Sequence, residues 1–222
     1  MLVTFSGVDN SGKTTQISCF SKMLSKHKCR HICVWARGGY TPGIELFKRV
    51  LRAVLPKTVP RKANVAQRNK AFSKKKIRQI WLIVAIIDLM IIWGVYVRWA
   101  LMRGNIVICD RYIDDTLVDF IEDFPSDDVG EWMLWKILRS VIPKPNISFL
   151  LIVPIEEQAR RSVQKGEEFP DSEGTRFNRM ERYCDEGFFP DTLYLRIDGL
   201  RPLDDIAELI WHQTRLIRNE TI

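Results

Sequence analysis

Gly7-Val8-Asp9-Asn10-Ser11-Gly12-Lys13-Thr14 is the stretch that decides the fold. It follows the short apolar run Leu2–Ser6 and opens a segment with helical spacing, Lys13–Lys28. The octapeptide matches the pattern G-x-x-x-x-G-K-[ST] at every position. Its glycines let successive backbone N–H groups turn inward, and the helix that starts there points its positive end at the same place. The sequence therefore predicts a phosphate-binding loop of the P-loop type between a buried strand and a helix.

Outward from this loop, short apolar runs alternate with helical patterns along the whole chain. The further runs that we expect to be strands are His31–Ala36, Asn105–Cys109, Ser148–Val153 and Leu193–Ile197. Such alternation is typical of a parallel sheet that is covered on both faces. We therefore expect one α/β domain over residues 1–222, a three-layer P-loop NTPase fold with a five-stranded parallel sheet and helices on both faces.

Composition narrows the class of protein. The 222 residues are 46% hydrophobic and 27% charged, which excludes a disordered or collagen-like chain. Lys and Arg number 34 against 27 Asp and Glu, and this excess favours anionic partners. The five cysteines form no C-x-x-C pair, so neither a zinc site nor a disulfide framework is predicted. No secretory signal pattern opens the sequence, and we expect a cytoplasmic protein.

Two segments depart from this average. Lys57–Arg78 carries nine Lys or Arg residues and no acid, and we expect a basic loop there. Ile77–Met102 is almost continuously apolar and long enough to cross a bilayer. The central Asp88 opposes a membrane span, since a carboxylate at that depth is costly, and a spanning helix would also split the sheet. We expect a buried helix, with a membrane-associated helix as the alternative.

Five longer motifs resemble one family. Phe5–Gln16 resembles F-x-G-x-D-x-x-G-K-[TS]-T-Q, and Arg37–Pro42 is similar to R-E-P-G-G-T-P. Ile106–Tyr112 ends in D-R-Y, Val153–Arg161 resembles the P-x-E-x-A-x-x-R start of a lid, and Ile197-Asp198-Gly199 is similar to a final strand and turn. These are motifs of the thymidylate kinases, within the P-loop nucleoside-monophosphate kinases, and together they span residues 3 to about 210.

The resemblance implies an ATP-dependent kinase that uses Mg²⁺ and has a small lid at about residues 155–172. The positions implied for ATP binding are Gly7, Asn10, Ser11, Gly12, Lys13, Thr14, Thr15 and Arg160. Those implied for catalysis are Lys13, Asp110, Arg111 and Arg161, with Thr14 and Asp110 as the metal ligands. Those implied for the phosphoryl acceptor are Asp9, Arg37, Asp88, Arg111 and Tyr112. Asp110 also fits on physical grounds, because the carboxyl end of a parallel strand beside a P-loop lies at the ligand crevice.

The acceptor half departs from the family pattern. Leu89 stands where the family has an arginine, and Val118-Asp119-Phe120 replaces its A-Y-Q. Polar groups that could read a base are thereby lost. Three functions remain open: a thymidylate kinase with altered contacts, a kinase of this family for another acceptor, and a nucleotide-binding protein that docks on an acidic membrane surface. Nucleotide substrates are the expected partners, a homodimer or a weak membrane association is possible, and no nucleic acid is expected.

Overall fold

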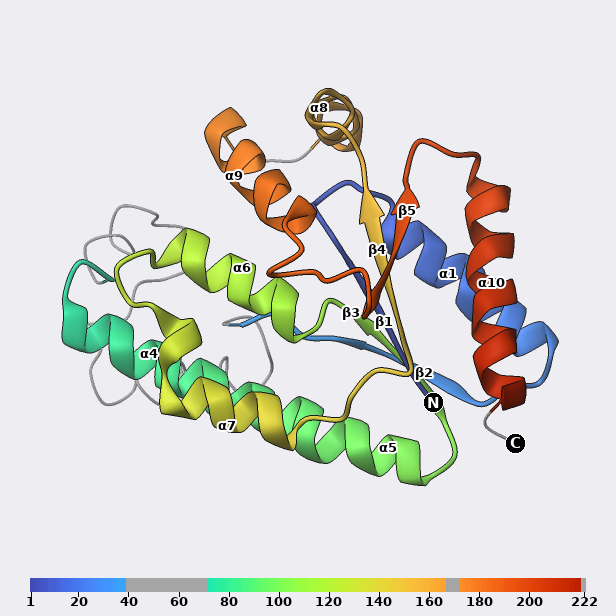
Figure 1. Ribbon diagram of the computed structural model, residues 1–222, viewed down its shortest axis with the longest axis horizontal. Coiled ribbons are helices and arrows are strands. Elements are labelled where there is room, and N and C mark those ends of the chain that lie inside the picture. Colours follow the sequence, from blue (N-terminus) through green and yellow to red (C-terminus); the bar gives the residue numbers. More distant parts are fainter. Residues whose placement is uncertain (39–71, 167–171, 221–222) are drawn as a thin grey trace.

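A computed structural model describes residues 1–38, 72–166 and 172–220. Within these ranges the chain forms a five-stranded sheet in the order β2-β3-β1-β4-β5, and every pair is parallel (Figure 1). The strands are β1 (Leu2–Gly7), β2 (His31–Trp35), β3 (Ile106–Asp110), β4 (Ile147–Ile152) and β5 (Tyr194–Asp198). The predicted α/β class with a five-stranded parallel sheet is confirmed, and each strand end lies within one residue of the predicted position.

Helices cover the two faces of the sheet. The helical elements are α1 (Lys13–Lys26), α4 (Lys75–Leu89), the π-helix η1 (Met90–Val97), α5 (Arg98–Met102), α6 (Ile113–Asp123), the short 3₁₀ turn η2 (Val129–Glu131), α7 (Met133–Val141), α8 (Ile155–Lys165), α9 (Glu173–Cys184) and α10 (Leu203–Glu220). Helices α1 and α10 lie together on one face, and α4 to α7 form the layer on the other (Figure 1). This arrangement leaves the carboxyl ends of β1, β3 and β4 free to build a site.

Each face has its own hydrophobic core. On the α1–α10 side, Phe5 packs at a ring-centroid distance of 5.3 Å from Phe149 and 6.1 Å from Phe20. On the other side, the aromatic rings of Trp81, Phe120 and Trp135 form a chain of contacts between helices α4, α6 and α7. The sheet is therefore buried on both faces, as its unbroken apolar strands require.

Part of the segment predicted as a basic loop, 57–78, is helical. Residues 57–71 lie outside the described residues. Lys75 and the residues after it form the first turn of α4, so the prediction was wrong for 75–78. Arg78 is held at that turn by an ion pair with Asp127 and by donation to the carbonyl of Phe72, 3.0 Å away. These fixed contacts allow helical geometry despite three consecutive lysines.

The apolar segment Ile77–Met102 is one continuous helix, formed by α4, η1 and α5, and it is not buried throughout. Its inner side belongs to the core and includes Leu82, Leu89 and Trp93, each with no exposed surface. Its outer side is exposed, for example at Ile91 (58%) and Val95 (63%). The expectation of a buried helix therefore holds for one side only. By length and composition alone, this is also the helix in the described residues that could cross a membrane.

Gly38 follows β2 and lies so close to Phe120 that any side chain at this position would collide with the ring. A Cβ atom there would lie 2.5 Å from Cε1 and Cζ of the Phe120 ring, which is itself packed between Trp81 and Trp135. We expect Gly38→Ala to lower the free energy of unfolding by about 1–3 kcal/mol, because the ring has no room to retreat.

Denaturant unfolding monitored by fluorescence or circular dichroism checks this. Gly174→Ala is the matched control, since a Cβ there meets nothing within 4 Å, and that variant should be as stable as the parent or slightly more so. Equal stability of both variants would contradict the packing described at Gly38.

Candidate active site

The turn between β1 and α1 has the backbone of a phosphate-binding loop. Gly7 (φ 138°) and Gly12 (φ 98°) adopt conformations that L side chains rarely reach, and Asn10 (φ 63°) is also left-handed. A Cβ on Gly7 would lie 2.3 Å from the carbonyl oxygen of Leu151, so only glycine fits beside β4. The pattern G-x-x-x-x-G is thus explained by two backbone positions, and α1 begins directly behind them with its N-terminus at the loop.

Lys13 is buried inside this loop. Its Nζ donates to the carbonyl oxygens of Gly7 (2.8 Å) and Val8 (2.6 Å) and to Oγ of Ser11 (3.3 Å). Burial, with the charge of Arg111 as the next cause, lowers the pKa of Lys13 to about 8. Lys13 therefore donates to acceptors of the loop itself. It could exchange these acceptors for the oxygens of an anion bound in the loop.

Asp110 ends β3 beside the loop, and Thr14 and Thr15 are exposed at the start of α1. Burial raises the pKa of Asp110, against the opposing charges of Lys13 and Arg111. In the described part of the chain, no hydrogen bond or ion pair engages the Asp110 carboxylate. A hydroxyl at the loop and a half-buried carboxylate without a partner are the kind of oxygen donors that Mg²⁺ accepts next to phosphates.

A ladder of alternating charges extends from the loop. Arg111 pairs with Asp9, Arg179 lies between Asp9 (3.4 Å) and Asp119 (3.3 Å), and Asp119 receives two hydrogen bonds from Arg37, at 2.7 and 2.9 Å. The five side chains come from the loop, the segments that follow β2 and β3, and helices α6 and α9. Asp115 lies 3.8 Å from Arg111 as well, so three guanidinium groups face three carboxylates, and the nearly buried Arg111 and Arg179 are held in place near the loop to bind an anion.

Asp9 is the most accessible member of this ladder. Its side chain is 43% exposed, whereas those of Arg111, Arg179 and Asp119 are each less than 10% exposed. Burial alone would raise the pKa of Asp9, but Arg111, Lys13, Arg37 and Arg179 together hold it well below its usual range. Asp9 is therefore a permanent anion at the open end of a cationic cluster.

Asp115 fixes the parts of the site relative to one another, and the sequence alone did not single it out. Its carboxylate is fully buried and accepts hydrogen bonds from Ser6 Oγ (2.6 Å), Tyr112 N (3.0 Å) and Tyr183 Oη (2.8 Å), and a longer one from Gly7 N (3.3 Å). Tyr183 also accepts from Arg111, at 3.0 Å. β1, the turn after β3 and α9 are thus tied to one carboxylate.

Arg160 and Arg161, both predicted for the nucleotide site, lie on α8 and point in different directions. Arg161 donates to the carbonyl oxygens of Asn10 (3.2 Å) and Gly199 (2.9 Å), so it lies over the loop. Arg160 is exposed and forms a double hydrogen bond with Glu157 on its own helix, at 2.7 Å each. Arg161 is brought to the loop and Arg160 is not, because neighbouring residues point about 100° apart on a helix.

Two residues predicted for the acceptor lie elsewhere. Tyr112 is 2% exposed, its ring packs 4.8 Å from that of Trp93, and its hydroxyl donates to the Pro143 carbonyl at 2.7 Å. It is thus held in the core beneath the site. Asp88 is buried on α4, where burial raises its pKa, and its Oδ2 has no hydrogen-bond partner in the described structure. Among the residues that the structure describes, no hydrogen bond or ion pair joins Asp88 to the charge ladder.

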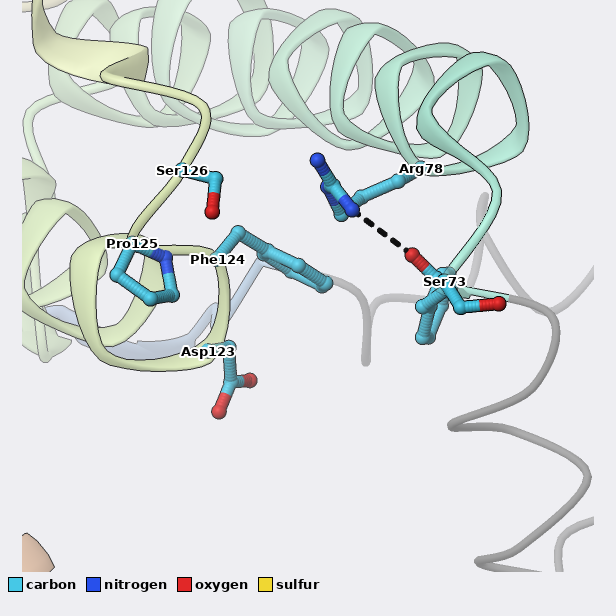
Figure 2. A pocket seen from close by; sticks show the side chains of 7 residues that line it. Ser73, Arg78, Asp123, Phe124, Pro125 and Ser126 are labelled. Carbon is cyan, nitrogen blue, oxygen red and sulfur yellow. Dashed lines mark hydrogen bonds between the residues drawn. The ribbon is translucent and has the colours of Figure 1, made fainter.

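A hollow of about 410 Å³ lies between the start of α4 and the end of α6. Figure 2 shows side chains that line it, among them Ser73, Arg78, Asp123 and Ser126. The hollow lies at the opposite end of α6 from the turn that carries Arg111. With α6 eleven residues long, about 16 Å of helix separates the two places. This hollow is therefore distinct from the loop and its charge ladder.

Comparison with known proteins agrees with this geometry. The family described as "Thymidylate kinase" matches residues 5–210. The thymidylate kinase of Rhodopseudomonas palustris is 26% identical over 96% of this chain and 88% of its own length. That of Bradyrhizobium sp. is 27% identical over the same shares, and that of Ehrlichia chaffeensis is 28% identical over 78% of this chain and 76% of its own. The match covers the loop, the turn after β3, helix α8 and β5, and this chain belongs to the thymidylate kinase family.

Proposed function

We propose that this protein transfers the γ-phosphoryl group of ATP to a nucleoside monophosphate, with thymidylate as the first candidate acceptor. The proposal rests on the position of Asp9, which lies between two groups of cations that could each bind an anion. On one side lies the loop with Lys13, and on the other lie Arg111, Arg179 and Arg37. Donor and acceptor phosphates are both anionic, and a reaction between them needs cations on both sides.

The position of each residue assigns it a role in binding the donor, orienting the acceptor or stabilising the transferred group. Lys13 and the loop N–H groups bind the donor phosphates, since the lysine can leave the Gly7 and Val8 carbonyls for phosphate oxygens. Arg161, which already touches the loop at Asn10, neutralises charge that develops on the transferred group. Arg111 and Arg37 orient the acceptor phosphate. No general base is needed when the nucleophile is a phosphate oxygen, so positioning and charge supply most of the acceleration.

Thr14 and Asp110 would hold Mg²⁺. The exposed hydroxyl at the start of α1 and the carboxylate at the end of β3 fit its preference for one or two protein oxygens together with substrate phosphates. A Mg²⁺ ion held by these two residues would supply positive charge against the donor phosphates.

Removing the loop cation tests the donor site. We expect Lys13→Ala to abolish phosphoryl transfer, with a loss of at least about a thousandfold in kcat/KM, because Lys13 is the loop's own cation. Lys22→Ala on the exposed side of α1 is the control and should keep parental activity. A coupled assay of ADP release measures both variants, and near-parental turnover by Lys13→Ala would show that the donor site is elsewhere.

The lowered pKa of Lys13 gives ATP binding a pH dependence. The ammonium form predominates below pH 8 and is lost as the pH rises through about 8, so the affinity for ATP should fall above that value. Because bound phosphates favour the charged form, binding near pH 8 should also take up protons.

Titration calorimetry between pH 7.5 and 9.5, in two buffers of different ionisation enthalpy, measures both quantities. An affinity that stays constant over this range, without proton uptake, would contradict the buried position of Lys13.

A second candidate function, transfer to a different acceptor, is favoured by the Arg37–Asp119 pair. Asp119 and Phe120 stand where the family has its A-Y-Q readers. Asp119 is engaged by Arg37 and Arg179, and the Phe120 ring fills the space against Gly38. Leu89, in place of a family arginine, is wholly buried in the core. These side chains leave thymine with fewer polar partners than the family pattern provides.

The loss of two charge-assisted contacts, each worth about 1.5–3 kcal/mol, should strongly weaken the binding of thymidylate and of its transition state. If this second function is the correct one, kcat/KM for thymidylate should be at least about a hundredfold below that for the preferred acceptor. A steady-state panel of nucleoside monophosphates measures this. Thymidylate turnover with kcat/KM of about 10⁴ M⁻¹s⁻¹ or above would instead support the plain family activity.

The partner predictions beyond small nucleotides remain proposals, as does the cytoplasmic location. A homodimer and an acidic membrane surface both call for an exposed apolar face, and one such face is present on the helix layer formed by α4, η1, α5 and α7.

A further inference from the structure

Arg179 is a nearly buried arginine that reaches the site from α9. Its side chain is 9% exposed, whereas Arg176 and Arg182 on the same helix are more accessible. Nη1 lies 3.4 Å from Oδ2 of Asp9, and Nη2 lies 3.3 Å from Oδ1 of Asp119. Burying a guanidinium costs free energy unless carboxylates face it. The two carboxylates therefore allow α9 to hold a cation at this place.

The contacts of Arg179 are long compared with those of Arg37. Arg37 donates to the two oxygens of Asp119 at 2.7 and 2.9 Å. Charge-assisted hydrogen bonds are typically about 2.7–2.9 Å long. At 3.3 and 3.4 Å, Arg179 is attracted by its two carboxylates without a short hydrogen bond to either of them. Its guanidinium can therefore turn toward the oxygens of an entering anion at a smaller cost than that of Arg37.

Asp119 holds both of these arginines in one place. Its side chain is 7% exposed, and its neighbours on α6, Val118 and Phe120, are buried in two different hydrophobic clusters. The backbone of α6 is therefore fixed at this turn, which also fixes where the carboxylate begins. Since Arg37 follows β2 and Arg179 lies on α9, one carboxylate joins two segments that are far apart in the sequence.

Helix α9 supports the site at a second point, one turn beyond Arg179. The hydroxyl of Tyr183 accepts a hydrogen bond from Arg111 at 3.0 Å and donates one to Asp115 at 2.8 Å. Residues four apart lie on the same side of a helix, so Tyr183 and Arg179 face the site together. Arg111 in turn pairs with Asp9. Each oxygen of Asp9 thus faces a guanidinium, one from the turn after β3 and one from α9.

Asp119 stands where the family pattern A-Y-Q has its tyrosine. A tyrosine at this position would be neutral and would need no cation, whereas a buried carboxylate needs one. Arg37 and Arg179 meet that need here. The substitution therefore places charge where the family pattern places a phenol ring, and it accounts for an arginine at this point of α9.

We propose that Arg179 is an acceptor-binding residue of this kinase, and that Asp119 is the positioning residue that orients it. The acceptor phosphate would be bound by Arg179 as well as by Arg111 and Arg37, and Asp119 would act only through its two arginines. This inference rests on the proposed function and extends it to α9. It also narrows the substrate class, because three guanidinium groups suit a phosphate monoester and contribute little to binding a neutral alcohol.

Steady-state kinetics with the full chain test the role of Arg179. The acceptor is thymidylate, or the monophosphate that the panel described above prefers. We expect Arg179→Gln to raise the KM for the acceptor by at least about tenfold and to leave the KM for ATP within about twofold, because a charge-assisted contact to the acceptor alone is lost. Arg179→Lys should lie between the parent and Arg179→Gln, since an ammonium keeps the charge but not the planar fork. The corresponding free nucleoside should be phosphorylated at least about a hundredfold less efficiently than the monophosphate.

Arg182→Gln is the matched control. Arg182 also joins α9 to α6, through Glu122 at 3.8 Å, and none of its described ion pairs is with a member of the ladder. Its replacement should keep both KM values within about twofold of the parent, because a partly exposed ion pair contributes little. The melting temperature of each variant shows whether it is folded in the assay, and Arg179→Lys carries the test if Arg179→Gln is not folded.

A double-mutant cycle tests the role of Asp119. If Asp119 acts through Arg179, then in an Asp119→Asn background Arg179→Gln should raise the KM for the acceptor by less than about threefold, against at least about tenfold in the parent. A role of Asp119 in stability alone would lower the melting temperature and leave the effect of Arg179→Gln at its full size, which would overturn the positioning role.

The same kinetics separate failure of this inference from failure of the proposed function. Suppose that the parent phosphorylates a nucleoside monophosphate, but Arg179→Gln leaves the KM for the acceptor unchanged or lowers kcat alone. The role of Arg179 would then be overturned and the proposed function would stand. A parent that phosphorylates no nucleoside monophosphate would overturn the proposed function, and this inference with it.

Discussion

The site depends on one buried carboxylate, that of Asp115. Burying an ionised group costs several kcal/mol unless its lone pairs are satisfied. Here donors from Ser6, Gly7, Tyr112 and Tyr183 satisfy them. Since these donors come from β1, the turn after β3 and α9, the requirement fixes three segments that are distant in sequence. The strand order 2-3-1-4-5 brings them near one another, and Asp115 sets their spacing.

That spacing produces the charge ladder. Arg111, at a left-handed φ of 74°, is held in the turn next to Asp115, and Tyr183 links it to α9, which also carries Arg179. Both arginines then reach Asp9 of the loop. Their side chains are nearly buried, so water screens them weakly, and a phosphate that entered beside Asp9 would meet preorganised cations. The strength of the site thus follows from the rigidity of its supports.

Sequence alone predicted the elements that rest on local patterns. The five strands follow from apolar runs, and the loop follows from two glycines that must adopt unusual φ angles. The parts that sequence reasoning missed depend on tertiary placement: Arg179 is unremarkable on α9 until that helix is docked. Hydrophobicity along 77–102 could not reveal that only one side is buried, because the inner and outer sides are equally apolar. The D-R-Y motif likewise could not show that the Tyr112 side chain points into the core.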